Sequence, residues 1–215
     1  MPPKILCLHG GGTSADIFRI QAIRLSRLLK SHFELVYADG FLESGPGPGV
    51  LPFFEGMEPY KQWIRDKDGD EEEQPWSGLP RLIEIFNRDG PFVGIIGFSQ
   101  GAKVATHLLR WLEQRGNQLD FAALFSGTVP LRQKIGTPEW PELVKPTIIT
   151  RSVHVIGEDD TYRNQNEALV DHYDKPSRVV IRFPGGHHMP TQPEINERLA
   201  KLLITYHEEA NDMYP

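Results

Sequence analysis

The chain has 215 residues, of which 24% are charged and 39% are hydrophobic, and its formal net charge is −6. This size and composition are typical of a globular protein, and we expect residues 1–215 to form a single domain. The negative charge argues against nonspecific binding to nucleic acid. No apolar run approaches the roughly 20 residues that cross a bilayer, so we expect no membrane span.

The chain has one cysteine, Cys7, which lies between Leu6 and Leu8 in the first apolar run. A single cysteine cannot form an intrachain disulfide, and its apolar neighbours predict that it is buried. The N-terminus, Met1-Pro2-Pro3-Lys4, leads directly into this run and shows no pattern of a signal or transit peptide. These features together predict a cytoplasmic protein.

The first 38 residues predict two strands with a helix between them. Residues 4–9 form an apolar run that ends at three glycines, Gly10 to Gly12. Apolar residues at helical spacing predict a helix over 14–31, and residues 33–38 predict the next strand. Strands that alternate with amphipathic helices are typical of an α/β fold, in which helices cover both faces of a mainly parallel sheet.

Residues 39–80 interrupt this alternation. The segment contains a Gly-Pro-rich stretch at 45–49, and a connection of this length inside a domain is usually functional. We expect it to contribute to a lid or an acyl pocket. The predicted pocket residues are its aromatic side chains, chiefly Phe53, Phe54, Tyr60 and Trp63, with Trp76 further along. The alternative is that these aromatics only hold the segment against the domain, and both interpretations can hold together.

The rest of the chain returns to alternating strands and helices. Acidic residues over 66–73 predict a solvated loop rather than a metal site. The predicted strands are 91–96, 121–125, 152–156 and 178–183. The predicted helices are 78–87, 102–115, 164–173 and 193–208, with an irregular proline-rich segment at 128–146.

The pentapeptide Gly97-Phe98-Ser99-Gln100-Gly101 stands between a predicted strand and a predicted helix. A G-x-S-x-G sequence in this context is typical of the nucleophile elbow of an α/β-hydrolase, which exposes a serine hydroxyl above the sheet. Side chains two residues before and after the serine would collide with the neighbouring helix and strand, so both positions favour glycine. Ser99 is therefore the candidate nucleophile, and the alternative is a serine that merely caps a helix.

A serine nucleophile needs a base and a group that orients the base, and α/β-hydrolases supply these in the order Ser, acid, His. Two acids, Asp159 and Asp160, follow a late strand, and two histidines, His187 and His188, follow the last one. We favour Asp160, because it lies three residues past the strand-ending Gly157. We favour His187, which follows a tight Gly-Gly turn, and expect His188 to pack or bond locally.

The tetrahedral intermediate of acyl transfer needs preorganised N–H donors. We expect one from the backbone of Gln100 and another from Gly11 or Gly12. His9, just before the glycines, is expected to brace this loop. The glycines lack the Gly-Lys-Ser/Thr of a phosphate loop and the G-x-G-x-x-G frame of a dinucleotide site. No histidine pair has metal-ligand spacing, so we expect no metal and no cofactor.

Four stretches of this sequence, 6–14, 97–102, 154–160 and 185–190, together resemble the FSH serine hydrolases. The stretch 44–57 is most similar to the fungal polyketide-pathway thioesterase branch of that family. The resemblance covers nearly the whole chain and implies an α/β-hydrolase without a large separate cap. It implies hydrolysis of an ester or thioester by Ser99, Asp160 and His187. For the polyketide branch it further implies release of an acyl chain from a carrier-protein thioester.

Three functions are compatible with these features. The first is a serine hydrolase of secondary metabolism that cleaves a polyketide or related acyl thioester, with water or a hydroxyl of the substrate as acceptor. Its partners would be the acyl substrate and an acyl carrier protein domain of a polyketide synthase. The second is a general short-chain carboxylesterase that uses the same residues. The third is a binding protein that retains the fold without catalysis.

Overall fold

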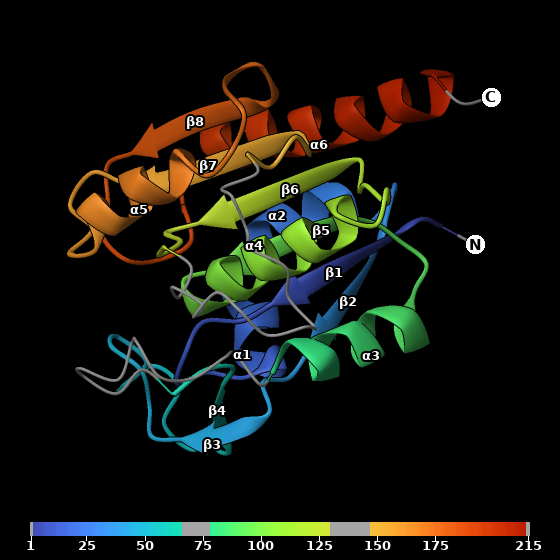
Figure 1. Cartoon of the computed structure of the whole chain (residues 1–215). Coiled ribbons are helices and arrows are strands. Elements are labelled where there is room, and N and C mark those ends of the chain that lie inside the picture. Colours follow the sequence, from blue (N-terminus) through green and yellow to red (C-terminus); the bar gives the residue numbers. More distant parts are fainter. Residues whose placement is uncertain (1, 66–77, 130–146, 214–215) are drawn as a thin grey trace.

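Six parallel strands form the central sheet of the protein (Figure 1). The computed structural model describes residues 2–65, 78–129 and 147–213. The order of the strands across the sheet is β2-β1-β5-β6-β7-β8. The first strand of the chain therefore lies inside the sheet, the second forms one edge, and the later strands follow in chain order to the other edge. The strands are β1 (Lys4–Leu8), β2 (Glu34–Ala38), β5 (Phe92–Phe98), β6 (Phe121–Phe125), β7 (Ser152–Gly157) and β8 (Arg178–Phe183).

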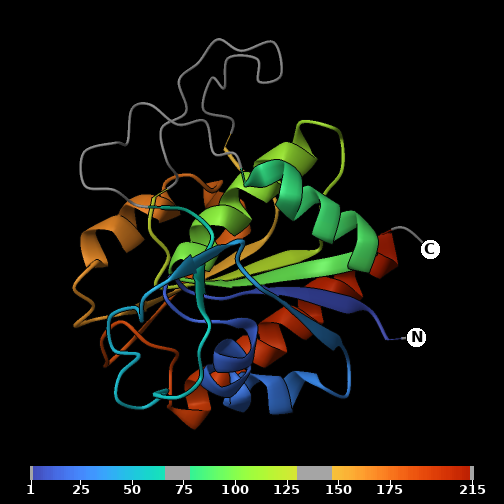
Figure 2. The same ribbon diagram turned by 90° about the horizontal axis from the view of Figure 1, so that it is seen from below.

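Helices cover both faces of the sheet, as the alternation in the sequence predicted (Figure 2). The helices are α1 (Ala15–Gln21), α2 (Ile23–Leu29), α3 (Leu79–Asp89), α4 (Gln100–Glu113), α5 (Arg163–Val170) and α6 (Pro193–Met213), with a short 3₁₀ turn, η1, at Lys175–Ser177. One apolar core joins the sheet to α3, α4 and α5, and a second joins its other face to α1, α2 and α6. Parallel strands buried on both faces explain why β5 and β6 are apolar throughout.

The predicted helix over 14–31 is two helices that meet at Ala22. Its backbone, at φ −88° and ψ 6°, lies outside the helical region and breaks the run. Both helices still contribute to the same core, with Phe18 from α1 and Leu25 from α2. The sequence indicated one helix because the apolar spacing continues across the break.

The described part of the 39–80 segment contains a small antiparallel sheet that the sequence did not predict. Strands β3 (Leu42–Ser44) and β4 (Tyr60–Gln62) pair with each other at the edge of the molecule, where Figure 1 draws them below the main sheet. Each is only three residues long, too short for a period of two to be visible in the sequence. Trp76, the acidic tract 66–73 and most of the irregular segment 128–146 lie outside the described residues.

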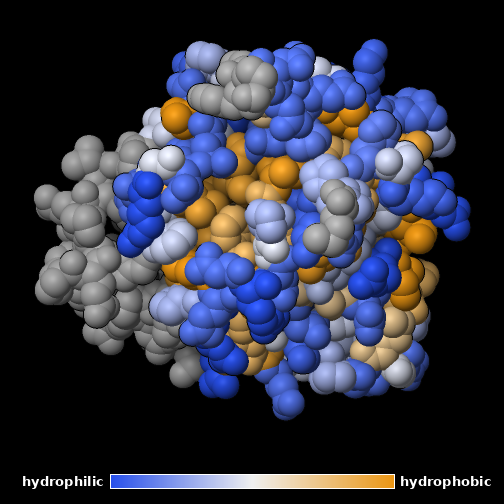
Figure 3. Space-filling view, turned by 90° about the vertical axis from the view of Figure 1, so that its right-hand side faces the viewer, coloured by the Kyte–Doolittle hydropathy of each residue, from blue (hydrophilic) through white to orange (hydrophobic). Residues whose placement is uncertain are grey.

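Figure 3 shows the face of the molecule toward which both termini lie. Apolar side chains are visible at its centre, between polar ones. This face is at the amino ends of the strands, since the chain enters β1 from this side in Figure 1. Among the helices of the described residues, none is both long enough and apolar enough to cross a membrane.

Three buried histidines, His9, His107 and His154, make stability depend on pH. Burial lowers the pKa of His9 to about 4, and it lowers the pKa values of His107, on α4, and His154, on β7, to about 3. Between about pH 4 and 6.5 the unfolded chain binds these protons and the folded chain does not, so stability is complete above pH 6.5 and falls as the pH falls. Each histidine contributes up to about 1.4 kcal/mol of unfolding free energy per pH unit.

We expect urea denaturation at several pH values in this window to show that decline. A His154→Leu variant should show a shallower decline than the wild type, because one of the three groups is gone. Equal slopes for both proteins would contradict this assignment.

Candidate active site

Ser99 occupies a sharp turn between β5 and α4. Its backbone has φ 52° and ψ −116°, a conformation that costs on the order of 1–3 kcal/mol for a residue with a side chain. A Cβ on Gly97 would lie 2.7 Å from the Cα of Ala102, and one on Gly101 would lie 2.1 Å from the carbonyl oxygen of Leu8. The two glycines of the pentapeptide therefore let α4 approach β5 and β1, as the sequence predicted.

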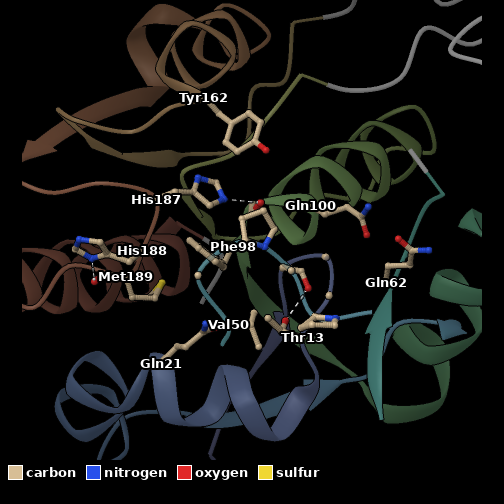
Figure 4. A pocket seen from close by; sticks show the side chains of 18 of the residues that line it. Thr13, Gln21, Val50, Gln62, Phe98, Gln100, Tyr162, His187, His188 and Met189 are labelled. Atoms are coloured by element: carbon tan, nitrogen blue, oxygen red, sulfur yellow. Dashed lines mark hydrogen bonds between the residues drawn. The ribbon is translucent and has the colours of Figure 1, made fainter. Parts of the chain in front are cut away.

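The side chains of Ser99, His187 and Asp160 form one chain of hydrogen bonds. His187 Nε2 lies 2.9 Å from Ser99 Oγ, the contact that Figure 4 marks with a dashed line. His187 Nδ1 lies 2.9 Å from Asp160 Oδ2 and 3.1 Å from Oδ1. A carboxylate only accepts, so Nδ1 carries the proton and Nε2 is left to accept from the serine hydroxyl.

Asp160 is held in place by burial and by a backbone donor. Its side chain is fully buried, and Oδ1 accepts a 2.8 Å hydrogen bond from the backbone N–H of Tyr162. The neighbouring Asp159 is exposed, and its backbone N–H donates to Gly185. The acid with the histidine contact is thus the one that the sequence favoured, three residues after Gly157.

Close backbone packing brings the acid and histidine loops together. A Cβ on Gly157 would lie 2.4 Å from the carbonyl oxygen of Gly186 and 2.5 Å from that of Gly185. The ring of His188 turns away from Ser99: its Nδ1 donates to the carbonyl oxygen of Met189 at 2.8 Å, and its Nε2 accepts from the N–H of Gly186 at 3.2 Å. The second histidine bonds locally, as the sequence predicted.

His9 braces the glycine loop, as its position in the sequence predicted. Its Nε2 accepts a 2.8 Å hydrogen bond from the N–H of Gly40, so Nδ1 is protonated and donates to the carbonyl oxygen of Gly10 at 2.7 Å. Thr13 Oγ1 donates to the same oxygen at 2.7 Å. Because its burial keeps His9 neutral, both bonds hold across the physiological range.

The glycine loop packs directly against the Gly-Pro-rich stretch. A Cβ on Gly12, where φ is +71°, would lie 2.1 Å from the backbone nitrogen of Gly47, and a Cβ on Gly47 would lie 2.3 Å from the carbonyl oxygen of Gly11. Gly47 N–H donates to Gly12 O at 2.9 Å. The N–H of Gly12 donates to the carbonyl oxygen of Lys61 at 2.9 Å, which leaves Gly11 as the candidate oxyanion donor of the two glycines.

Gln100, the residue after the nucleophile, also anchors the end of the 39–65 segment. Its Oε1 accepts from the N–H of Trp63 at 2.7 Å, and its Nε2 donates to the carbonyl oxygen of Ile64 at 2.8 Å. Gln100 is also the first residue of α4, and its backbone N–H lies at the helix N-terminus, where the helix dipole favours negative charge. The sequence indicated the backbone role of Gln100 but not this side-chain contact, which joins residues 36 and 37 positions apart.

A pocket of about 1220 Å³ opens beside Ser99 and His187. Phe53 and Phe54 line it, as predicted. Tyr60 and Trp63 are instead buried in the core, so the expectation that they line the pocket is not met. Tyr60 packs with Ile17 and Val50, and the Trp63 indole donates to the carbonyl oxygen of His9 at 2.9 Å. These two aromatics hold the segment against the domain, which was the alternative interpretation.

Two aromatic rings flank the imidazole of His187 (Figure 4). Tyr162 meets it edge-on with 5.0 Å between ring centroids, and Phe98 lies at 5.2 Å. No sequence pattern singled out Tyr162, although its position two residues after Asp160 places it on the same loop. In the described parts of the chain, no three acidic, histidine or cysteine side chains gather as metal ligands would. Cys7 is buried in β1, and burial raises the pKa of its thiol.

A family model described as "Serine hydrolase (FSH1)" matches residues 1–199. The chain belongs to this family. Esterase FUS5 of Gibberella moniliformis is 41% identical over 214 residues, covering 95% of this chain and 87% of that protein. The dihydromonacolin L-[lovastatin nonaketide synthase] thioesterase of Aspergillus terreus is 31% identical, covering 95% of this chain and 93% of that one.

Solved structures show the same fold in more distant proteins. The Bacillus cereus carboxylesterase has a TM-score of 0.64 at 18% identity and covers 95% of this chain and 89% of its own. The type II thioesterase BorB has a TM-score of 0.62 at 15% identity, with 97% and 92% covered. The chain is therefore a serine hydrolase of the FSH1 family with an α/β-hydrolase fold, and its curated relatives are esterases and thioesterases.

The contact between Gly12 and Gly47 predicts a large loss of stability when Gly12 gains a side chain. In Gly12→Ala, the new Cβ meets Gly47 and also disfavours the positive φ, so we expect unfolding free energy to fall by about 3 kcal/mol. Gly49→Ala is the matched control, because its φ is +75° and its Cβ would meet open space. It should lose only about 1–2 kcal/mol, and equal losses in urea denaturation would contradict the steric explanation.

Proposed function

We propose that this FSH1 hydrolase cleaves an acyl thioester through an acyl-enzyme on Ser99 and releases a polyketide or related acyl chain from a carrier protein. The hydrogen-bonded series from Ser99 through His187 to Asp160, open to the pocket, carries the proposal. Similarity to relatives named as esterases and as a polyketide synthase thioesterase supports the substrate class.

In the proposed mechanism, His187 Nε2 takes the proton of Ser99 as Oγ attacks the thioester carbonyl. The carboxylate of Asp160 stabilises the imidazolium that forms. The backbone N–H groups of Gln100 and Gly11 hold the oxyanion, and loss of one such donor typically costs about 10²–10³ in rate. Collapse of the tetrahedral intermediate expels the thiolate, which takes the proton from His187.

The acyl-enzyme is then cleaved by an acceptor that His187 deprotonates. Water gives the free acid, and a hydroxyl on the acyl chain gives a lactone. Either acceptor regenerates Ser99 and returns the imidazole to its neutral form. The single cysteine is buried, which suits a reducing compartment, and we propose the cytoplasm as the location.

The test compares matched substrates that differ only in the leaving group. Intact mass spectrometry should detect an acyl adduct on Ser99 after incubation with acyl N-acetylcysteamine thioesters, and turnover should be faster with carrier-bound acyl groups. Exclusive activity on simple soluble esters would favour a short-chain carboxylesterase and overturn the proposal. The same assay run with the product mixture resolved by chromatography separates acid from lactone.

A further inference from the structure

Two polar side chains on the wall of the pocket have oxygens that lack hydrogen-bond partners. Gln21, the last residue of α1, and Ser44, the last residue of β3, both line the pocket beside Ser99. Gln21 Oε1 and Ser44 Oγ are buried, and neither has a hydrogen-bond partner among the described residues. Buried polar groups without a partner are uncommon and costly, so these two atoms call for an explanation.

The two side chains flank the same apolar cluster. Ile17 and Gln21 are four residues apart on α1 and share a face of that helix, and Ile17 packs against Val50 and Tyr60. Ser44 stands directly opposite Tyr60 in the β3–β4 pair, so both side chains are on one face of the small sheet. Figure 4 shows Gln21 rising from α1 on the side of the pocket where Val50 lies.

The surroundings of these groups suit a chain that is mostly apolar. The pocket is lined by the apolar side chains of Val50, Phe53, Phe54, Phe98 and Met189. An acyl chain that fills such a pocket can supply the partner that the buried oxygens of Gln21 and Ser44 lack. A plain hydrocarbon chain would leave both unpaired.

A hydroxyl is the group that satisfies both side chains. The oxygen of a carboxamide accepts and its nitrogen donates, while the Ser44 hydroxyl can do either. A hydroxyl on the substrate also donates and accepts, so it fits whichever end of the Gln21 amide faces it. The terminal torsion of glutamine has a broad energy well, which lets the amide turn toward the pocket without a change of rotamer.

We propose that Gln21 and Ser44 form a subsite that binds a hydroxyl group carried by the acyl chain, so that the enzyme prefers hydroxylated acyl substrates. The inference rests on the proposed function, in which this pocket holds the acyl group. A site built to hydrogen-bond a substrate hydroxyl rejects the analogue that lacks it much more strongly than an apolar pocket can distinguish chain lengths.

The test measures kcat/KM for octanoyl N-acetylcysteamine thioester and for a series of its monohydroxylated isomers. The wild type should prefer at least one hydroxylated isomer by tenfold or more. Gln21→Leu, which keeps the bulk and removes the polar end, should reduce that preference about tenfold. Ser44→Ala should reduce the same preference.

Gln165→Leu is the matched control, because Gln165 also lines the pocket but is exposed. It should keep the wild-type preference. The proposal is overturned if no isomer exceeds octanoyl, if Gln21→Leu and Ser44→Ala both keep the preference, or if the Gln165 variant loses it equally. Calorimetric binding of the matched unhydrolysable amides separates the hydroxyl subsite from the proposed thioesterase activity. Tighter binding of the hydroxylated amide supports the subsite even where no thioester is cleaved.

Discussion

Replacement of Ser99 by alanine is expected to reduce kcat by about 10⁵–10⁶-fold, because no other group can form the acyl-enzyme. The fold should survive the change. Alanine keeps the backbone at φ 52° at the same steric cost as serine, and the backbone N–H of Ser99 still donates to Phe125 O at 2.8 Å. The measurement is steady-state hydrolysis of an acyl thioester, with circular dichroism to verify the fold.

Ser126 offers a matched control within the same sheet. It follows β6 as Ser99 follows β5, it too has a positive φ of 46°, and its side-chain oxygen is buried without a partner among the described residues. Ser126→Ala should therefore keep near-wild-type turnover. A fluorophosphonate probe should label the wild type and the Ser126 variant but not Ser99→Ala. Labelling of the Ser99 variant would place the nucleophile elsewhere, and an unlabelled wild type would favour a silent binding protein.

The elbow could be predicted from the sequence because its causes are local. A strand, a turn and a helix follow each other within about twenty residues, and the two glycines at Gly97 and Gly101 mark the close approaches that the structure contains. The acid and the histidine lie far away in sequence, but parallel strands end at one edge of a sheet. The order of the strand ends was enough to bring these candidates together.

Contacts that depend on side chains from distant segments could not be predicted in the same way. Tyr60 and Trp63 have the composition of a pocket wall, yet the side-chain clamp from Gln100 and the indole bond to His9 draw this part of the segment into the core. The contact between Gly12 and Gly47 was equally hidden, since a glycine in a sequence does not show which backbone it faces. Phe53 and Phe54 line the pocket as the sequence predicted, whereas Tyr60 and Trp63 do not.

The hydrogen bonds of His187 to Asp160, and not to Asp159, predict a second large effect on kcat. Asp160→Asn is expected to reduce kcat by about 10⁴-fold, by changing the tautomer of His187 rather than its position. The backbone N–H of Tyr162 already donates to Oδ1 of Asp160, so the amide oxygen of asparagine takes that place. The amide NH₂ then faces His187 Nδ1, at the position 2.9 Å away where the carboxylate oxygen lay.

That arrangement turns Nδ1 into an acceptor and moves the proton of the imidazole to Nε2, which faces Ser99 Oγ and can no longer take its proton. Asp159→Asn makes the same chemical change one residue earlier, on an exposed side chain, and should alter kcat less than twofold. Steady-state kinetics of both variants decide the assignment. A similar loss of kcat in the two variants, or a larger loss in Asp159→Asn, would contradict the geometry. Of the two carboxylates, only that of Asp160 contacts the imidazole of His187.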